Sequence, residues 1–447
     1  MVFSAMAIGV SARHALADES DAGARSDAGA EQAAVPSTAI PEGAADAAPS
    51  SAPVNASPPD AGVARPISPV EEGPGAASLG AAPAPDFRPP PSDEVTLNLK
   101  LYGDTGYTVR NNTDQMPAEP NVYSPGVWNS FSASHLDLFA TADWEKLSFL
   151  AELLIEAGDN EFGYDAERLQ ISYLISNWLR VRAGRSHLAL GYYNDSYHHG
   201  NLFELTTSRP YSVNFEDGGG LLLAHNVGVG ADGTIDAKSA GSFRYDLDVG
   251  NGRNSDISAV AVSFSEKNDK LVNLRLRWLP PIDGLIIGVN GMRDVVPGLP
   301  AAAQITGRAK AEELVGGAHV VYTEHSVHLD LEGFVIRHDN EGTDATTIRG
   351  GFLELGYSIG AFTPYVRAEY LRFPSGGDPV YQYSSDSAQG QISGTQSIYY
   401  DAKDFSDFRL GVKWLPIPQL ALKGEVERLA HDRVHQEIAT LKAAFGF

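Results

Sequence analysis

The C-terminal stretch Val434–Phe447 reads VHQEIATLKAAFGF and alternates two kinds of residue. Phe445 and Leu441 share a face with the terminal phenylalanine, whereas Lys442 and Thr440 fall on the other face, because successive side chains of a strand point to opposite sides. One face suits lipid and the other suits water. The stretch therefore predicts the last strand of a membrane β-barrel, with a soluble sheet that ends on a half-buried strand as the alternative.

The same alternation recurs from Val95 to the C-terminus, in segments of roughly ten to fourteen residues separated by turn-forming clusters. Clear examples are the stretches 95–102, 147–156, 243–249, 272–278, 327–335 and 408–414. A helical period of comparable length does not compete with this pattern. We expect an all-β fold, a transmembrane antiparallel up-and-down β-barrel of about sixteen strands over residues 95–447.

The connections between these segments alternate in length. Short links are expected near 144–146, 176–179, 280–284, 324–326, 358–362 and 416–419, and long links near 110–130, 158–166, 191–218, 251–269, 296–310 and 374–404. Two links fit less well, since the one near 231–240 is long for its place and the one near 431–433 is short. Loops segregated by length indicate an outer-membrane barrel, whereas a soluble sandwich has no reason to show them.

Tryptophans mark the same end of the expected strands. Trp144, Trp178, Trp278 and Trp414 each lie where a strand meets a short link. Tryptophan is enriched where a membrane meets water, so four at one level indicate an interfacial aromatic girdle. This placement favours the membrane barrel over the soluble sheet.

Composition excludes several other classes of protein. The chain of 447 residues has no cysteine, which excludes a disulfide scaffold, a cysteine zinc site and a cysteine nucleophile. It lacks an apolar run of about eighteen residues, which a membrane helix needs. Its formal charge of -24 argues against a nucleic-acid partner, because such proteins present a basic face to phosphates.

The N-terminal part differs from the rest in composition. Residues 1–17, MVFSAMAIGVSARHALA, contain an apolar run and an A-x-A cleavage site, and predict a secretory signal peptide whose basic start is missing or truncated. Residues 18–94 are rich in alanine, proline and acidic residues. They cannot bury enough apolar surface to offset the entropy of ordering, so we expect a disordered linker, located in the periplasm beside an outer-membrane barrel.

A barrel of about sixteen strands is too wide for side chains to fill, so its interior should hold a water-filled channel unless a loop enters it. The polar faces of the strands carry both signs of charge. The pore-lining candidates are Arg180, Arg182, Arg275, Arg277, Asp330, Glu332 and Glu354. Such charges either filter solutes across the pore or simply pair with one another in a polar interior, and both interpretations stay open.

The link at 191–218, GYYNDSYHHGNLFELTTSRPYSVNFEDG, is the expected constriction. Its many tyrosines and phenylalanines suit packing against an inner wall better than floating in solvent. The residues expected to project into the opening are Asp195, His198, His199, Glu204, Arg209, Glu216 and Asp217.

The segments RAGRSHLALGYYNDSYHHG and SRPYSVNFEDGGG are similar to part of the bacterial phosphate-selective porin-like proteins. In general diffusion porins the third long loop folds into the barrel, and this link has that position. The resemblance implies an outer-membrane porin for passive diffusion of small hydrophilic solutes or ions, a homotrimer, and recognition of the terminal strand by the barrel assembly machinery. Phosphate selectivity would need several basic residues, whereas the link holds Arg209 alone and no lysine, so we expect weak cation preference.

Other functions have weaker support in the sequence. His198 and His199 are adjacent and lack the spacing of metal ligands, so we expect neither a metal site nor a cofactor. Ser326 beside His325, and the histidines near 431–435, do not define a nucleophile with an oriented base, so we expect no enzyme activity. The alternative to a porin is a structural or adhesive barrel with a plugged lumen.

Overall fold

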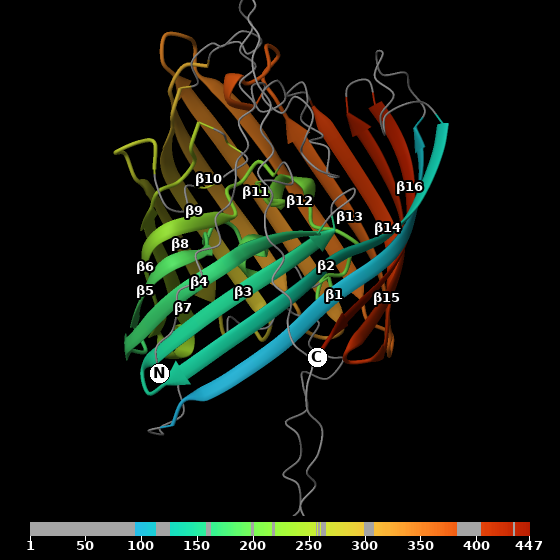
Figure 1. The fold of residues 1–447 in the computed structure, drawn as a ribbon, viewed down its shortest axis with the longest axis horizontal. Helices are drawn as coiled ribbons and strands as arrows, with labels where there is room; N and C mark the ends of the chain where they lie inside the picture. The colour runs from blue at the N-terminus through green and yellow to red at the C-terminus, as the bar shows by residue number, and fades with distance from the viewer. Residues whose placement is uncertain are drawn as a thin grey trace, which may run out of the picture. The chain divides into compact units, whose positions relative to one another are not determined.

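The computed structural model describes residues 94–112, 126–157, 162–197, 201–216, 220–255, 257, 260, 265–298, 308–381, 404–431 and 434–447. They form a closed barrel of sixteen antiparallel strands, in which each strand pairs with its neighbours in sequence and β1 pairs with β16 (Figure 1). The predicted fold class is confirmed. The strands are β1 (Thr96–Asn112), β2 (Gly126–Trp144), β3 (Leu147–Ala157), β4 (Phe162–Ser176), β5 (Leu179–His187), β6 (His225–Asp236), β7 (Ser242–Gly250), β8 (Leu271–Leu279), β9 (Leu285–Val296), β10 (Ala311–Tyr322), β11 (Val327–Asn340), β12 (Thr346–Tyr357), β13 (Phe362–Arg372), β14 (Phe405–Ile417), β15 (Leu420–His431) and β16 (Val434–Gly446).

In the described part of the chain, helical structure lies in the connections, where residues 379–381 form one helical turn. The others are α1 (Tyr193–Ser196) and the 3-10 turns η1 (Tyr211–Val213) and η2 (Lys238–Ala240). Among the described residues, helices long and apolar enough to cross a membrane are absent.

Strand β8 shows why this sequence makes a barrel of this kind. Arg275 and Arg277 are buried inside, whereas Leu274 and Leu276 are exposed outside. A water-soluble protein buries the opposite set of side chains, so the exposed leucines require an apolar surrounding. The alternation seen in the sequence therefore sorts charged side chains into the lumen and apolar side chains toward lipid.

The closing strand is the C-terminal one, as its sequence predicts. β16 pairs with β1 from Tyr102 opposite Gly446 to Asn112 opposite Gln436. Leu101 and Phe447 add a reciprocal pair of backbone hydrogen bonds, each 2.9 Å long. The barrel consequently has no free edge in the spanning region.

Short turns gather at one end of the barrel, here called the short-turn end, and the longer connections lie at the other, the long-loop end. Trp144, Trp178, Trp278 and Trp414 are all exposed at the short-turn end. The predicted long link at 231–240 is wrong, because β6 continues to Asp236 and only residues 237–241 turn. Thr234 and Ile235 keep β6 in register with β7, which removes the apparent misfit.

Candidate functional site

In the connection from β5 to β6, the described residues 188–197, 201–216 and 220–224 fold into the barrel interior. Leu188, Leu190, Leu221 and Leu223 at its two ends have no exposed surface. They belong to an apolar cluster that includes interior side chains of β9 to β15. The expected inward loop therefore exists and is longer than residues 191–218. We call it the inserted loop.

Lysines of the barrel wall donate hydrogen bonds to backbone carbonyls of the inserted loop. Lys413 on β14 has its Nζ 2.5, 3.1 and 3.0 Å from the carbonyl oxygens of residues 202–204. Lys423 on β15 donates to the carbonyl of Thr206 at 2.7 Å. A charged donor is thus surrounded by backbone acceptors, which satisfies buried groups on both sides.

Carboxylates of the same wall accept hydrogen bonds from the loop. Glu369 on β13 accepts from the backbone N–H groups of Tyr211 and Ser212 at 2.8 and 2.7 Å. Glu425 on β15 accepts from the backbone N–H of Thr207 at 3.2 Å and from its hydroxyl at 2.6 Å. Strands β11 to β15, here the β11–β15 wall, therefore bond chiefly to the loop's backbone.

The predicted pore-lining acids lie on this wall. Glu332 on β11 accepts the backbone N–H of Tyr192 at 3.0 Å, and a Cβ at Gly191, where φ is 77°, would collide with its carboxylate. Glu354 accepts from the loop at 3.3 Å through the hydroxyl of a threonine. Asp330 lies opposite Glu354 in the sheet and is fully buried. These three carboxylates meet the loop, or one another, inside the barrel.

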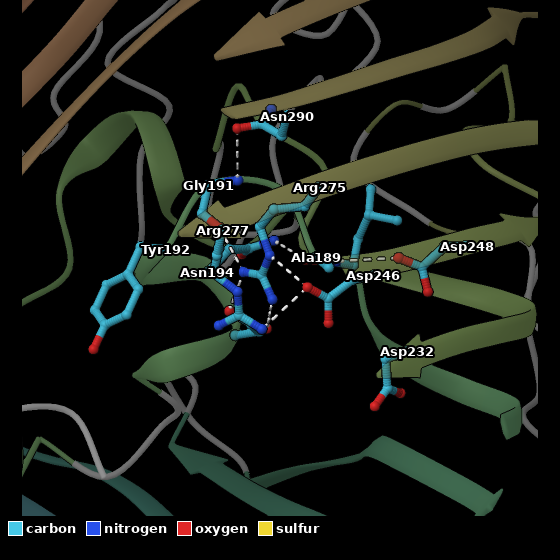
Figure 2. Close-up of polar contacts among 12 residues, drawn as sticks. Ala189, Gly191, Tyr192, Asn194, Asp232, Asp246, Asp248, Arg275, Arg277 and Asn290 are labelled. Carbon is cyan, nitrogen blue, oxygen red and sulfur yellow. Dashed lines mark hydrogen bonds and ion pairs between the residues drawn. The ribbon is translucent and has the colours of Figure 1, made fainter. Parts of the chain in front are cut away.

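The predicted arginines lie on strands β5 to β8, the β5–β8 wall, which meets the loop differently (Figure 2). Arg275 binds both carboxylate oxygens of Asp195 at 2.7 and 2.6 Å, and also Asp246 at 3.0 Å. Arg277 shares Asp246 at 3.0 Å. Here side-chain charges pair with side-chain charges, and most of the pairs join neighbouring strands.

Two further predicted arginines extend this network toward the short-turn end. Arg180 and Arg182 both pair with Asp232 on β6, at 2.9 and 2.5 Å. Arg182 also contacts Asp248 on β7. The arrangement alternates positive and negative groups along the wall, so each charge is partly neutralised by the next.

Exposure separates the two walls. The side chains of Arg180, Asp232 and Asp195 remain 19%, 16% and 22% exposed. On the β11–β15 wall, the side chains of Arg367 and Arg409 are 0% and 1% exposed. On the β5–β8 wall Arg275 and Asp248 are sealed too, at 0% and 1%, so the accessible charged groups lie around Arg180, Asp232 and Asp195.

Within the loop, the predicted constriction residues take part in internal contacts. Arg209 donates to the carbonyls of Val213 and Tyr197 at 2.9 and 2.6 Å, and its guanidinium lies 4.3 Å from the ring centre of Phe215. Burial lowers the pKa of Arg209, although Glu204 acts against this. Burial likewise raises the pKa of Glu204, which Lys423 and Arg209 oppose. Arg209 therefore holds these parts of the loop together.

The other constriction candidates are distributed differently. Glu216 accepts from the backbone N–H groups of Ala224 and His225 at 2.9 and 2.7 Å, which closes the root of the loop. Asp195 reaches the β5–β8 wall, as described above. His198, His199 and Asp217 lie outside the described residues, so their predicted positions remain predictions.

Loops at the long-loop end pack over the returning part of the inserted loop. Arg253 donates to the carbonyls of Leu221 and Ile257 at 2.5 and 3.1 Å and pairs with Glu313 at 3.1 Å. Tyr381 donates to the same carbonyl of Leu221 at 2.9 Å. The residues around Leu221 are therefore covered by apolar and paired polar groups.

Part of the site could not be predicted. Lys413, Lys423 and Glu369 fall on the polar faces of their strands, but the sequence does not state which interior charges meet the loop. A second omission is a cluster of two histidines and a glutamate at the root of the loop. Its members are far apart in sequence, so spacing alone carries no signal of it.

Comparison with known proteins identifies the fold alone. Protein-family profiles and curated sequences give no match. The OmpT outer-membrane protein of Vibrio cholerae, solved in a trimer form, aligns with a TM-score of 0.52 at 12% identity over 79% of this chain and 100% of that one. The anion-selective porin from Comamonas acidovorans aligns with a TM-score of 0.50 at 12% identity over the same shares. The chain thus has a barrel similar to those of outer-membrane porins.

Proposed function

We propose that the chain is an outer-membrane porin in which small hydrophilic solutes or ions pass along the β5–β8 wall, while the inserted loop fills the rest of the lumen. One observation carries this proposal. Arg180 and Asp232 on that wall and Asp195 of the loop stay partly exposed, whereas the charged side chains of the β11–β15 wall are sealed. A polar path bordered by paired charges is suited to hydrated solutes.

The charges along this path predict mild selectivity. Arg180 and Arg182 share Asp232, and Arg275 and Arg277 share Asp246. Because each acid is paired with arginines, neither sign dominates the path, which speaks against a strong anion filter. We propose a small conductance with a weak ion preference, and the loop as its constriction.

Localisation and assembly follow from the same proposal. The barrel lies in the outer membrane, residues 18–94 lie in the periplasm, and the porin is a homotrimer that recognises solutes without enzyme activity. The trimer form of the similar Vibrio cholerae protein supports the assembly. The exposed apolar outer surface offers area for contact between copies as well as for lipid.

The test is single-channel conductance of the full-length protein in a planar bilayer, with the reversal potential measured under a salt gradient. We expect discrete openings in the wild type. Glu369→Gln with Glu425→Gln weakens the bonds that hold the loop to the β11–β15 wall and should raise the conductance. Glu312→Gln, which removes an exposed acid paired with Arg293 on the outer surface, serves as the matched control and should leave it unchanged.

A plugged structural or adhesive barrel is the second candidate, and the covered long-loop end favours it. Arg253 and Tyr381 donate hydrogen bonds to the carbonyl of Leu221 at the long-loop end. The cluster of side chains around Leu221 is apolar. A folded, heat-modifiable barrel that conducts neither as wild type nor as the Glu369/Glu425 double variant would refute the porin and support this alternative.

A further inference from the structure

Three side chains with metal-binding atoms converge at the root of the inserted loop. They are Glu167 on β4, His187 at the end of β5 and His225 at the start of β6. One ligand atom from each lies within 4.8 Å of the others. All three residues are buried, with exposures of 3%, 6% and 3%. Two imidazoles and a carboxylate form a donor set that zinc accepts.

The backbone places these groups by two local features. His187 and His225 are directly opposite each other in the β5–β6 ladder, and their ring centres lie 5.1 Å apart. Glu167 is the extra residue of a β-bulge, because Glu152 pairs with residue 168 and Leu153 with residue 166. A bulge of this kind redirects a side chain, and here it places the carboxylate beside the histidine pair.

A fourth residue orients one of the histidines. The Oε2 of Glu216, in the inserted loop, lies 2.9 Å from Nδ1 of His225. The other ring nitrogen, Nε2, lies 2.5 Å from Oε2 of Glu167. A carboxylate on the ring nitrogen away from the metal is the usual partner of a metal-binding histidine, since it fixes the tautomer and the ring orientation.

We propose that Glu167, His187 and His225 bind a divalent metal ion of the zinc class, with Glu216 as the positioning residue. Ligand distances of about 2.0–2.2 Å in a tetrahedral site require ligand atoms about 3.3 Å apart, so small rotations of the three side chains suffice. The three protein ligands leave one position for water. The ion joins β4, β5 and β6 to both ends of the inserted loop, and so ties the loop to the barrel.

One neighbouring cation competes with this role. A guanidinium nitrogen of Arg185 lies 3.9 Å from Oε2 of Glu167, and its Nε donates to the backbone carbonyl of Glu167 at 2.9 Å. The same guanidinium lies 3.4 Å from the carboxylate of Asp165. Asp165 therefore gives Arg185 a second acid.

The experiment is zinc titration of the full-length, untagged protein in detergent after chelation and removal of the chelator, followed by calorimetry. We expect a single Zn²⁺ per chain, with binding weakened at least tenfold in both His187→Ala and Glu167→Gln. Glu216→Gln should weaken binding by about 10–100-fold while the stoichiometry is kept. His328→Ala is the matched control, because this buried histidine lies 3.2 Å from Glu354 and, among the described residues, belongs to no group that could hold a metal ion.

Absence of stoichiometric zinc binding would overturn the proposal, as would equal weakening in His328→Ala or retention of binding in both ligand variants. In that case His225 is a charged imidazolium held between Glu167 and Glu216. If the ligand variants do not fold, the wild type still decides: Co²⁺ should give visible absorption bands that Zn²⁺ abolishes, and a spectrum of hydrated Co²⁺ alone refutes the site. Because the readout is metal binding, it is independent of whether the barrel conducts.

Discussion

The inserted loop contacts two walls of the barrel, and the charged side chains of these walls have different kinds of partner. On the β11–β15 wall, side chains such as Lys413 and Glu369 bond to the loop's backbone and are sealed from solvent. On the β5–β8 wall, Arg180 and its neighbours pair with aspartates and keep part of their surface exposed. A charged side chain that bonds to the loop's backbone fixes the loop in place. A partly exposed side chain that pairs with an opposite charge remains available to a passing solute.

The largest expected effect breaks the attachment at the β11–β15 wall. Lys413→Met leaves the carbonyls of residues 202–204 without their shared donor, and buried unsatisfied groups are costly. We expect the free energy of unfolding to fall by about 3 kcal/mol, measured by urea denaturation in lipid vesicles. Lys310→Met, at an exposed lysine that pairs with Asp269, should change it by less than about 0.5 kcal/mol. Equal effects of the two variants would contradict the sealed attachment.

A smaller effect is expected where the loop meets the β5–β8 wall. Asp195→Asn removes the loop's carboxylate from Arg275, which still keeps Asp246 at 3.0 Å and the carbonyl of Gly191 at 2.6 Å. The loss should be about 1 kcal/mol in the same denaturation experiment, because Arg275 stays paired and Asp195 is partly exposed. A loss as large as that of Lys413→Met would remove the distinction between the walls.

Ion preference tests the β5–β8 wall directly. Arg180→Gln with Arg182→Gln leaves Asp232 without its two partners, so the reversal potential should move toward cation preference. The change corresponds to roughly 0.5–1 kcal/mol, the scale of partly screened pairs. Arg337→Gln, an exposed arginine paired with Asp339, is the control and should leave the potential unchanged. An unaltered potential in the double variant would place the path elsewhere.

The smallest effect concerns pH. Burial raises the pKa of Glu204 above its ordinary value of 4.5, so its contribution to stability is present below that pH and is lost as the pH rises through the raised pKa. Glu204→Gln should therefore be more stable than the wild type at neutral pH, by roughly 0.5 kcal/mol, and lose this advantage near pH 4. Urea denaturation at both pH values measures the difference. A wild type that gains stability with rising pH relative to the variant would contradict the assignment.

The sequence predicted the barrel because alternation is a property of each strand by itself. The Val434–Phe447 stretch, the exposed tryptophans and the aromatic inserted loop all carry their structural meaning locally. The contacts between loop and wall could not be predicted, since Thr207 and Glu425 are 218 residues apart and many interior charges were available. Glu167 escaped prediction because a bulge, which alternation does not reveal, sets its direction.

The reach of the inserted loop also has a consequence for how the chain folds. Its hydrogen bonds to the β11–β15 wall join residues separated by 139 to 222 positions, with the most distant partner on β15. The loop is therefore synthesised long before the strands that carry its hydrogen-bond partners. Its polar backbone must stay hydrated until those strands have been made. Contacts this distant in sequence form slowly. Expulsion of water from between the loop and the β11–β15 wall should thus be a late step of biogenesis, completed only when the last strands arrive and β16 meets β1.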